Sequence, residues 1–336
     1  MVHMVPALRC GLRLVHCALL SVLPLLSIGC ASKTTTPSEV DAEMASEAKG
    51  TSEKSDASSW STLGHLPRGC VAVINVHWDK LRKNPVFGRE IVPRIVSRFM
   101  RGAGDDAAVE AFRSTTNISL ETIRQFSFCF RKEGADLGVV GFVSAEYNKG
   151  SLLPALQSER ETKPTTLSLD GVTMITLEDD LVVAELSPKV IGVGQSAKLV
   201  RMGIRQGDGA STYRLNPNDD IGIAFDGSIT KDEEDPNPII ERISAGQVSV
   251  NLSERSLIVR LESSSPGESK ELEGILLSAR DGMLKKTDLA KPMREALQSA
   301  KTSRQGDAVT VVVRYPPAAI EAVVQAVAAE MDAPEE

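Results

Sequence analysis

Hydrophobic and polar residues alternate along much of the chain with the period of two that is typical of half-buried strands. Within residues 125–131 the three phenylalanines point to one side of the expected strand, whereas Ser127 and Cys129 point to the other. Asp170-Gly171 stands between two such segments and favours a two-residue hairpin. Alternation or apolar runs predict strands at 70–78, 125–131, 137–145, 181–186, 190–193, 220–226, 247–252, 257–261 and 308–314.

Other segments carry apolar residues three and four positions apart, which indicates one buried face of a helix. Asn84-Pro85 has the composition of a helix start, and Pro93 must kink or divide the helix that follows. Further helices are expected near residue 151, over 196–205, around 272–283 and from 316 to about 331.

Part of this order repeats. The segment 247–252 matches 125–130 position by position, and each is followed by a second apolar strand and a helix. We interpret this as an internal duplication, although any hairpin followed by a helix gives a similar pattern. The expected fold is α+β, with two similar units over residues 63–207 and 208–336. Each unit is expected to have an antiparallel sheet with helices packed on one face.

The N-terminus has a different composition. Arg9 and Arg13 precede a largely apolar run over residues 14–28, which is too short to span a bilayer as a helix. Residues 31–62 are rich in small, polar and charged side chains and cannot bury enough apolar surface to fold. Residues 1–29 are therefore expected to be a signal peptide, and residues 30–62 a flexible tether.

The stretch Leu25-Leu26-Ser27-Ile28-Gly29-Cys30 resembles the lipobox of bacterial lipoproteins, although Ser27 occupies the place where that family usually has leucine. The resemblance implies cleavage before Cys30 and acyl chains, such as palmitate, on its sulfur and new amino group. Because Ala31 is not aspartate, it also implies an outer-membrane lipoprotein that faces the periplasm or the cell surface. An ordinary secretory signal with a soluble product, and an uncleaved anchor, are the alternatives.

Cys70 and Cys129 are the two cysteines that remain in the body of such a mature protein. Both belong to expected strands, so that a disulfide between them and two buried free thiols are both compatible with the sequence. With His65 and His77 as the remaining histidines, they make no convincing zinc site, and no metal or cofactor is expected.

The mature chain is acidic. Without Arg9 and Arg13 it keeps 36 of its 38 basic residues against 45 acidic ones, a net charge of −9. No basic cluster stands out in the body, and we therefore expect no nucleic-acid partner.

Two motifs suggest chemistry. Residues 192–197 fit the glycine fingerprint of dinucleotide sites, but a strand that ends on glycines before Ser196 as a helix N-cap fits equally. The same turn resembles a nucleophile elbow, and a hydrolase would need Ser196 to meet His77 and either Asp79 or Asp226. Lys198 stands where such an elbow needs a small residue.

Two further segments have polar side chains that could contact ligands. Trp78, between His77 and Asp79, could be a contact point, but is expected to pack on the following helix. The acidic run 232–235 lacks the spacing of a calcium loop.

The favoured function is therefore a non-catalytic, lipid-anchored binding or scaffolding module of the cell envelope. Its expected partners are the membrane, through the lipid, and either envelope proteins or an apolar ligand. A carrier of apolar ligands is the alternative, and a serine hydrolase is a third hypothesis. Residues 66–331 also loosely resemble a poorly characterised group of secreted bacterial proteins with two α+β halves, which implies a fold but no activity.

Overall fold

The computed structural model describes residues 61–94, 110, 113–134, 136–158, 164–177, 181–206, 212–230, 240–287 and 289–332. The predicted signal peptide, Cys30, most of the tether and the acidic run 232–235 lie outside these residues. None of the helices within the described part is long and apolar enough to cross a membrane.

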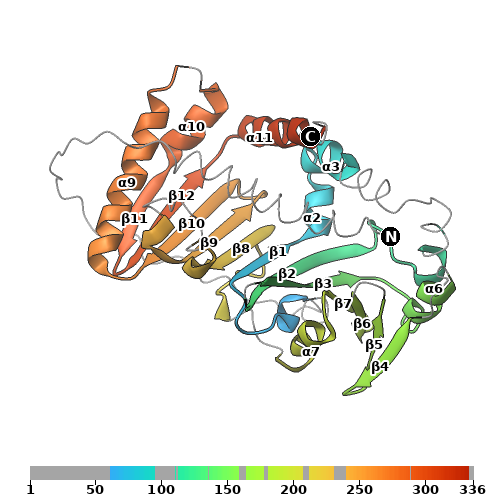
Figure 1. Cartoon of the computed structure of the whole chain (residues 1–336). Coiled ribbons are helices and arrows are strands. Elements are labelled where there is room, and N and C mark those ends of the chain that lie inside the picture. Colours follow the sequence, from blue (N-terminus) through green and yellow to red (C-terminus); the bar gives the residue numbers. More distant parts are fainter. Residues whose placement is uncertain are drawn as a thin grey trace, which may run out of the picture.

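All strands of the described part belong to one 12-stranded sheet, in the order β11-β12-β10-β9-β8-β1-β2-β3-β7-β6-β5-β4 (Figure 1). Every neighbouring pair is antiparallel. The strands are β1 (Ala72–Val76), β2 (Ile123–Glu133), β3 (Asp136–Ala145), β4 (Thr165–Leu169), β5 (Val172–Thr176), β6 (Val182–Ser187), β7 (Val190–Gly194), β8 (Ile221–Asp226), β9 (Ile243–Asn251), β10 (Ser256–Ser263), β11 (Lys301–Gln305) and β12 (Ala308–Arg314). The expected α+β class with antiparallel pairing is confirmed.

The two halves share this sheet, and the expectation that each half has a sheet of its own is wrong. Strand β1 pairs on one side with β2 and on the other with β8, the first strand of the second half. The apolar run of β1 indicates that the strand is buried, but it does not show what lies along its second edge. The boundary near residue 207 stays a prediction.

The register between the halves is compatible with the duplication. Asn75 lies opposite Gly222, Ser127 opposite Asn75, and Ser249 opposite Gly222. Segments 125–130 and 247–252 therefore occupy equivalent places on either side of the β1–β8 pair. The duplication itself stays a prediction.

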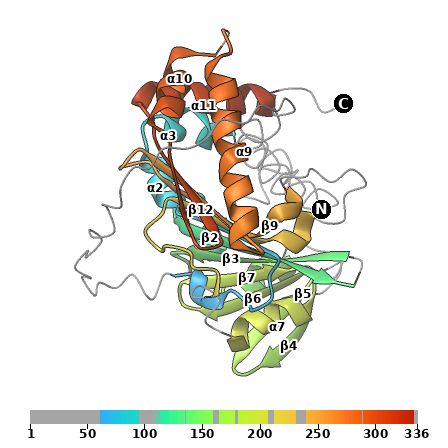
Figure 2. The same ribbon diagram turned by 90° about the vertical axis from the view of Figure 1, so that its left-hand side faces the viewer.

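The helices cover both faces of the shared sheet. The expectation that helices pack on one face of each half is wrong for the first half, whereas the helices of the second half do share one face. The helices of the described part are η3 (Leu63–His65), α2 (Trp78–Lys83), α3 (Phe87–Glu90), α6 (Leu152–Ser158), α7 (Ala197–Gln206), η5 (Gly227–Thr230), η6 (Ile240–Arg242), α9 (Pro266–Leu284), α10 (Lys291–Ser299) and α11 (Pro317–Asp332). Side chains directly opposite each other on paired strands share a face, and neighbours in a strand alternate. Helix α9 packs on the face of Leu261 and Val309, whereas α7 and η3 pack on the face of Cys129 and Val140. Figure 2 shows α9 above the strands and α7 below them.

Helix α7 lies unusually close to the sheet, because Gly203 has no side chain. A Cβ atom at this position would lie 2.3 Å from Cζ of Phe142 and 2.9 Å from the carbonyl oxygen of His65. We expect Gly203→Ala to lower the free energy of unfolding by about 1–3 kcal/mol through overpacking, as measured by urea denaturation.

Gly274→Ala is the matched control, because a Cβ at Gly274 in α9 would meet no atom within 4 Å. Gly274→Ala should raise the free energy of unfolding by about 0.5–1 kcal/mol, because alanine has less backbone freedom than glycine in the unfolded chain. Equal stability of the two variants would contradict the close packing of α7.

Candidate functional site

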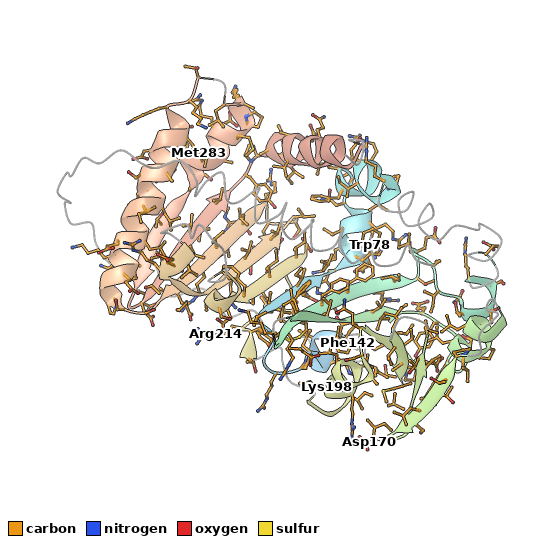
Figure 3. The ribbon with its side chains drawn as sticks, viewed as in Figure 1. Trp78, Phe142, Asp170, Lys198, Arg214 and Met283 are labelled. Carbon is orange, nitrogen blue, oxygen red and sulfur yellow. A yellow bond between two sulfur atoms is a disulfide. The ribbon has the colours of Figure 1, made fainter. Side chains whose placement is uncertain are left out.

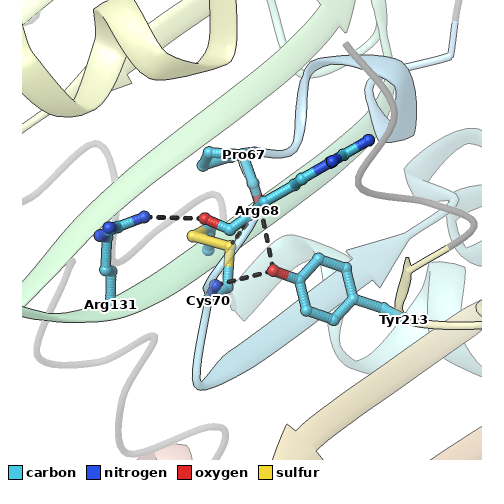
Figure 4. Close-up of a disulfide and its surroundings, with 6 residues drawn as sticks. Pro67, Arg68, Cys70, Arg131 and Tyr213 are labelled. Carbon is cyan, nitrogen blue, oxygen red and sulfur yellow. Dashed lines mark hydrogen bonds between the residues drawn. A yellow bond between two sulfur atoms is a disulfide. The ribbon is translucent and has the colours of Figure 1, made fainter. Parts of the chain in front are cut away.

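Cys70 and Cys129 are joined by a disulfide in this structure, with a Cα–Cα distance of 5.5 Å (Figure 4). The sequence was compatible with a disulfide and with two buried free thiols, and the structure contains the disulfide. Both residues are buried, and they belong to the core cluster that lies beneath α7. The bridge closes a loop over 59 positions of sequence, from the segment before β1 to the middle of β2.

The turn that leads into Cys70 is held from two sides. The Tyr213 hydroxyl donates to the Pro67 carbonyl at 3.0 Å and accepts the Cys70 N–H at 2.7 Å. On the other side, the Arg131 guanidinium donates to the Arg68 carbonyl at 2.7 Å (Figure 4). The sequence indicated neither Tyr213 nor Arg131 as a partner of this turn. Both residues are distant from it along the chain, and Tyr213 also lies outside any strand.

A buried polar network fixes the place where the body begins. Thr62 is fully buried; its N–H donates to Gln125 Oε1 at 3.3 Å, and its hydroxyl lies 2.5 Å from that of Ser127. Gln125 and Ser127 both donate to Asn75 Oδ1, at 2.6 and 2.9 Å. Because Leu63 and Leu66 are buried beside this network, the chain that leads from the predicted tether is firmly attached to the sheet at Thr62.

Polar side chains also gather where β1 ends and β8 begins. The Lys80 ammonium donates to the Asn218 carbonyl at 2.8 Å and lies 3.5 Å from the Asp220 carboxylate. The other carboxylate oxygen of Asp220 accepts the Leu252 N–H at 2.6 Å. His77 Nε2 faces the Pro217 carbonyl at 2.8 Å, so that this nitrogen carries the proton. These contacts tie the first half to the second and leave His77 no free lone pair on Nε2 with which to act as a base.

Burial changes the titration of two groups near this cluster. It raises the pKa of the Asp219 carboxyl, although hydrogen bonds from Ser249 and from Asn216, the latter at 3.0 Å, act in the opposite direction. It also raises the pKa of Tyr315 to about 12, with a smaller contribution from the charge of Asp220. The Tyr315 hydroxyl donates to the Asn251 carbonyl at 3.0 Å, which is a structural use of this group.

The structure does not bring together the residues of the hypothetical hydrolase. Ser196 follows β7, and His77 follows β1. Strand β1 is connected to β7 through β2 and β3 by three antiparallel pairings, so that β1 and β7 run in opposite directions. The two side chains therefore lie at opposite ends of the strands, roughly 15 Å or more apart at 3.3 Å per residue. Asp226 follows β8 and lies at the same strand ends as Ser196, away from His77.

The glycine fingerprint has a packing role. Strand β7 lies between β3 and β6 in an antiparallel sheet, and not in the parallel unit that binds dinucleotides. A Cβ at Gly194 would lie 2.8 Å from Val200 of α7. The Ser196 hydroxyl accepts the Leu199 N–H at 3.3 Å as an N-cap, which is the alternative that the sequence allowed.

Trp78 is a core residue. It is the first residue of α2 (Figure 3) and it is buried. Its ring meets that of Phe126 edge-on at a centroid distance of 5.7 Å. Its indole N–H donates to the Leu120 carbonyl at 2.8 Å. Trp78 thus packs mainly on β2 and the loop before it. The sequence had suggested that it would pack on the helix that follows it.

Two histidines make stability depend on pH. Burial lowers the pKa of both His65 and His77 below the ordinary value of 6.5, and the charge of Lys80 contributes at His77. The unfolded chain therefore takes up protons at higher pH than the folded protein does. Their contribution to stability is complete above pH 6.5 and is lost as the pH falls from there through the folded pKa values.

We expect the Tm of the wild type to decrease when the pH is lowered from 7.5 to 5.5. We expect a smaller decrease in Tm for the double variant His65→Gln/His77→Gln. Calorimetry at both pH values tests this. An unchanged slope in the double variant would assign the pH dependence to the carboxylates instead.

One face of the sheet is apolar across the junction of the halves. We call this the junction face: residues Ile74, Val76, Phe128, Ile221 and Val250 of β1, β2, β8 and β9. The register places these side chains on the face that α9 covers further along the sheet, and each is only partly buried. Sequence alternation indicated each apolar side, but not that the sides of the two halves would join.

No group of three or more histidine, cysteine or acidic residues is placed to hold a metal ion among the residues that the structure describes.

No protein-family profile and no curated protein matches the chain. Solved structures of TP0453 are similar at a low level. Crystal forms I, IV and III of that protein give TM-scores of 0.40, 0.46 and 0.42 at 10%, 12% and 10% identity. The alignments cover 80–81% of this chain and 97–98% of TP0453. A likeness at this level places no functional residue in the present chain.

Proposed function

We propose that this protein is a lipid-anchored component of the bacterial cell envelope, whose body binds a partner or ligand and catalyses no reaction. Cys30 would carry the acyl chains, and the outer membrane would be the site of attachment. The polar segment up to residue 61 would then connect the lipid to a body that begins at the buried Thr62.

The Cys70–Cys129 bridge is the observation that supports this proposal most. Disulfides persist in oxidising compartments outside the cytoplasm and are rare inside it. A bridge in the core of the body therefore agrees with export directed by the apolar N-terminal run. The separation of Ser196 from His77 counts against the one arrangement of a serine and a histidine that the sequence offered.

Metabolic labelling with a radioactive fatty acid tests the anchor. The wild-type protein should incorporate label and fractionate with the envelope, whereas Cys30→Ala should incorporate none. Cys70→Ala serves as the control for the loss of a cysteine and should still be labelled. Label that persists in Cys30→Ala would contradict the proposal.

The junction face favours a second candidate, a carrier of apolar ligands. Apolar side chains that remain partly exposed between packed helices are suited to contact acyl chains, and the polar cluster of Lys80 and Asp220 at the strand ends would meet a headgroup. Native mass spectrometry of protein purified from the envelope should then show a bound lipid.

Val250→Glu should abolish this adduct, because it introduces a charge into the junction face. Ile258→Glu is the matched control: Ile258 lies opposite Ser249, the neighbour of Val250 in β9, and therefore faces the other side of the sheet. A lipid adduct in neither the wild type nor the control would contradict the carrier.

A further inference from the structure

The two outer strands of the sheet differ in their protection. Strand β11 at one end carries Lys301 and Arg304, as edge strands usually do to prevent pairing with other chains. Strand β4 at the other end reads Thr-Thr-Leu-Ser-Leu and carries no charge. Its Leu167 is 52% exposed, more than any other large hydrophobic residue in the described part of the chain. The hairpin that it forms with β5 projects from the end of the molecule, where Asp170 marks the tip (Figure 3).

The hairpin turn shows which backbone groups face outward. Asp170 and Gly171 have φ values of 52° and 77°, as in a two-residue turn with both central residues left-handed. The pair that flanks such a turn, Leu169 and Val172, exchanges backbone hydrogen bonds. By alternation, Leu167 also bonds toward β5, whereas the N–H and C=O groups of Thr166 and Ser168 point away from β5 along the open edge.

We propose that β4 pairs with the β4 of a second copy of this chain, antiparallel and about a two-fold axis at Leu167. The two outward residues lie symmetrically around Leu167, so that Thr166 of one copy meets Ser168 of the other, and both pairs exchange N–H···O bonds. The two Leu167 side chains face each other in the closely spaced, non-hydrogen-bonded position. The sheets of both copies become continuous.

A second copy fits this edge for reasons of symmetry and charge. Pairing about Leu167 brings two exposed leucines into mutual contact and sets threonine opposite serine, a pair that stabilises sheets by side-chain hydrogen bonds. The chain as a whole has a net charge of −7. Because β4 is uncharged, two copies can approach along it without like charges in register. The pairing does not depend on the proposed lipid at Cys30.

Leu167→Cys in the full chain, produced in cells that export it, tests the axis. Directly opposite Cα atoms in the closely spaced position lie about 4.5 Å apart, within the range of a disulfide. Since Cys70 and Cys129 are bridged, we expect a disulfide-linked dimer on non-reducing gels. Ile258→Cys, 39% exposed on β10, is the matched control and should remain monomeric, as should the wild type.

The register gives a second, independent test. Thr166→Cys and Ser168→Cys should each remain monomeric when produced alone, because identical residues are out of register. Co-production of the two variants with different tags should give a cross-linked heterodimer.

Three results would overturn the proposal: a monomeric Leu167→Cys protein whose thiol still reacts with a maleimide, adducts only to a different protein, or cross-linking of Ile258→Cys to the same extent. Fatty-acid labelling of Leu167→Cys reports on the anchor separately. Loss of labelling with retained cross-linking would therefore count against the lipoprotein and not against the dimer.

Discussion

Replacing Cys70 and Cys129 together by alanine should lower the free energy of unfolding by about 4 kcal/mol. The bridge closes a loop over 59 positions, and the entropy that such a loop removes from the unfolded chain corresponds to that value. The effect on the folded state should be small, because Tyr213 and Arg131 hold the same turn by hydrogen bonds. Urea denaturation of the exported protein measures the loss, and a reducing agent should produce a similar loss in the wild type.

Cys30→Ala is the control for this experiment, because Cys30 lies outside the described body. Its unfolding curve should match that of the wild type, measured for both without detergent. If the double variant were as stable as the wild type, the bridge would add nothing to the stability of the body. The bridge would then support an oxidising compartment only because it is present, and not because the body needs it for stability.

Phe142→Ala should destabilise the protein by about 3–5 kcal/mol, the range for a large aromatic residue removed from a core. Phe142 of β3 is fully buried, and its ring stacks on that of His65 at 5.9 Å. It also fills the space that Gly203 of α7 leaves open. The loss should therefore affect the sheet, the helix and the segment that joins the predicted tether, as measured by urea denaturation.

A double-mutant cycle tests this assignment. The overpacking caused by Gly203→Ala should be smaller in a Phe142→Leu background, because the ring atoms that the new Cβ would meet are gone and only the contact with the His65 carbonyl oxygen remains. The two changes should thus be coupled and not additive. Additive effects would show that Gly203 is needed for a reason other than its contact with Phe142.

Local chemistry was sufficient to predict most elements. The segment 308–314 forms β12 with the expected bounds, and the turn at Asp170-Gly171 links β4 to β5. Asn84 accepts N–H bonds at the start of the expected helix. Helix α10 and strand β11 were missed, because α10 is short and β11 has mostly exposed polar residues without alternation.

The prediction of the site succeeded less well for a physical reason. Alternation within a strand depends on backbone geometry and on burial, both of which act over a few residues, so that it can be read along the chain. Whether Ser196 meets His77 depends on the number of antiparallel steps between their strands, which the pattern does not record. The same holds for the bridge, whose two cysteines were compatible with pairing but also with two free thiols.

The order of polar and apolar residues thus specified the antiparallel α+β class, the strand faces, the turn at Asp170-Gly171 and the composition of the N-terminal segments, because each depends on neighbouring residues. The three-dimensional arrangement settled how the pieces meet. It joined the halves through β1 and β8, placed helices on both faces, bridged Cys70 to Cys129 and left the outer edge of β4 without a partner strand among the described strands. Those outcomes depend on contacts between distant segments, where many pairings satisfy the same local pattern and only packing of the whole chain selects one.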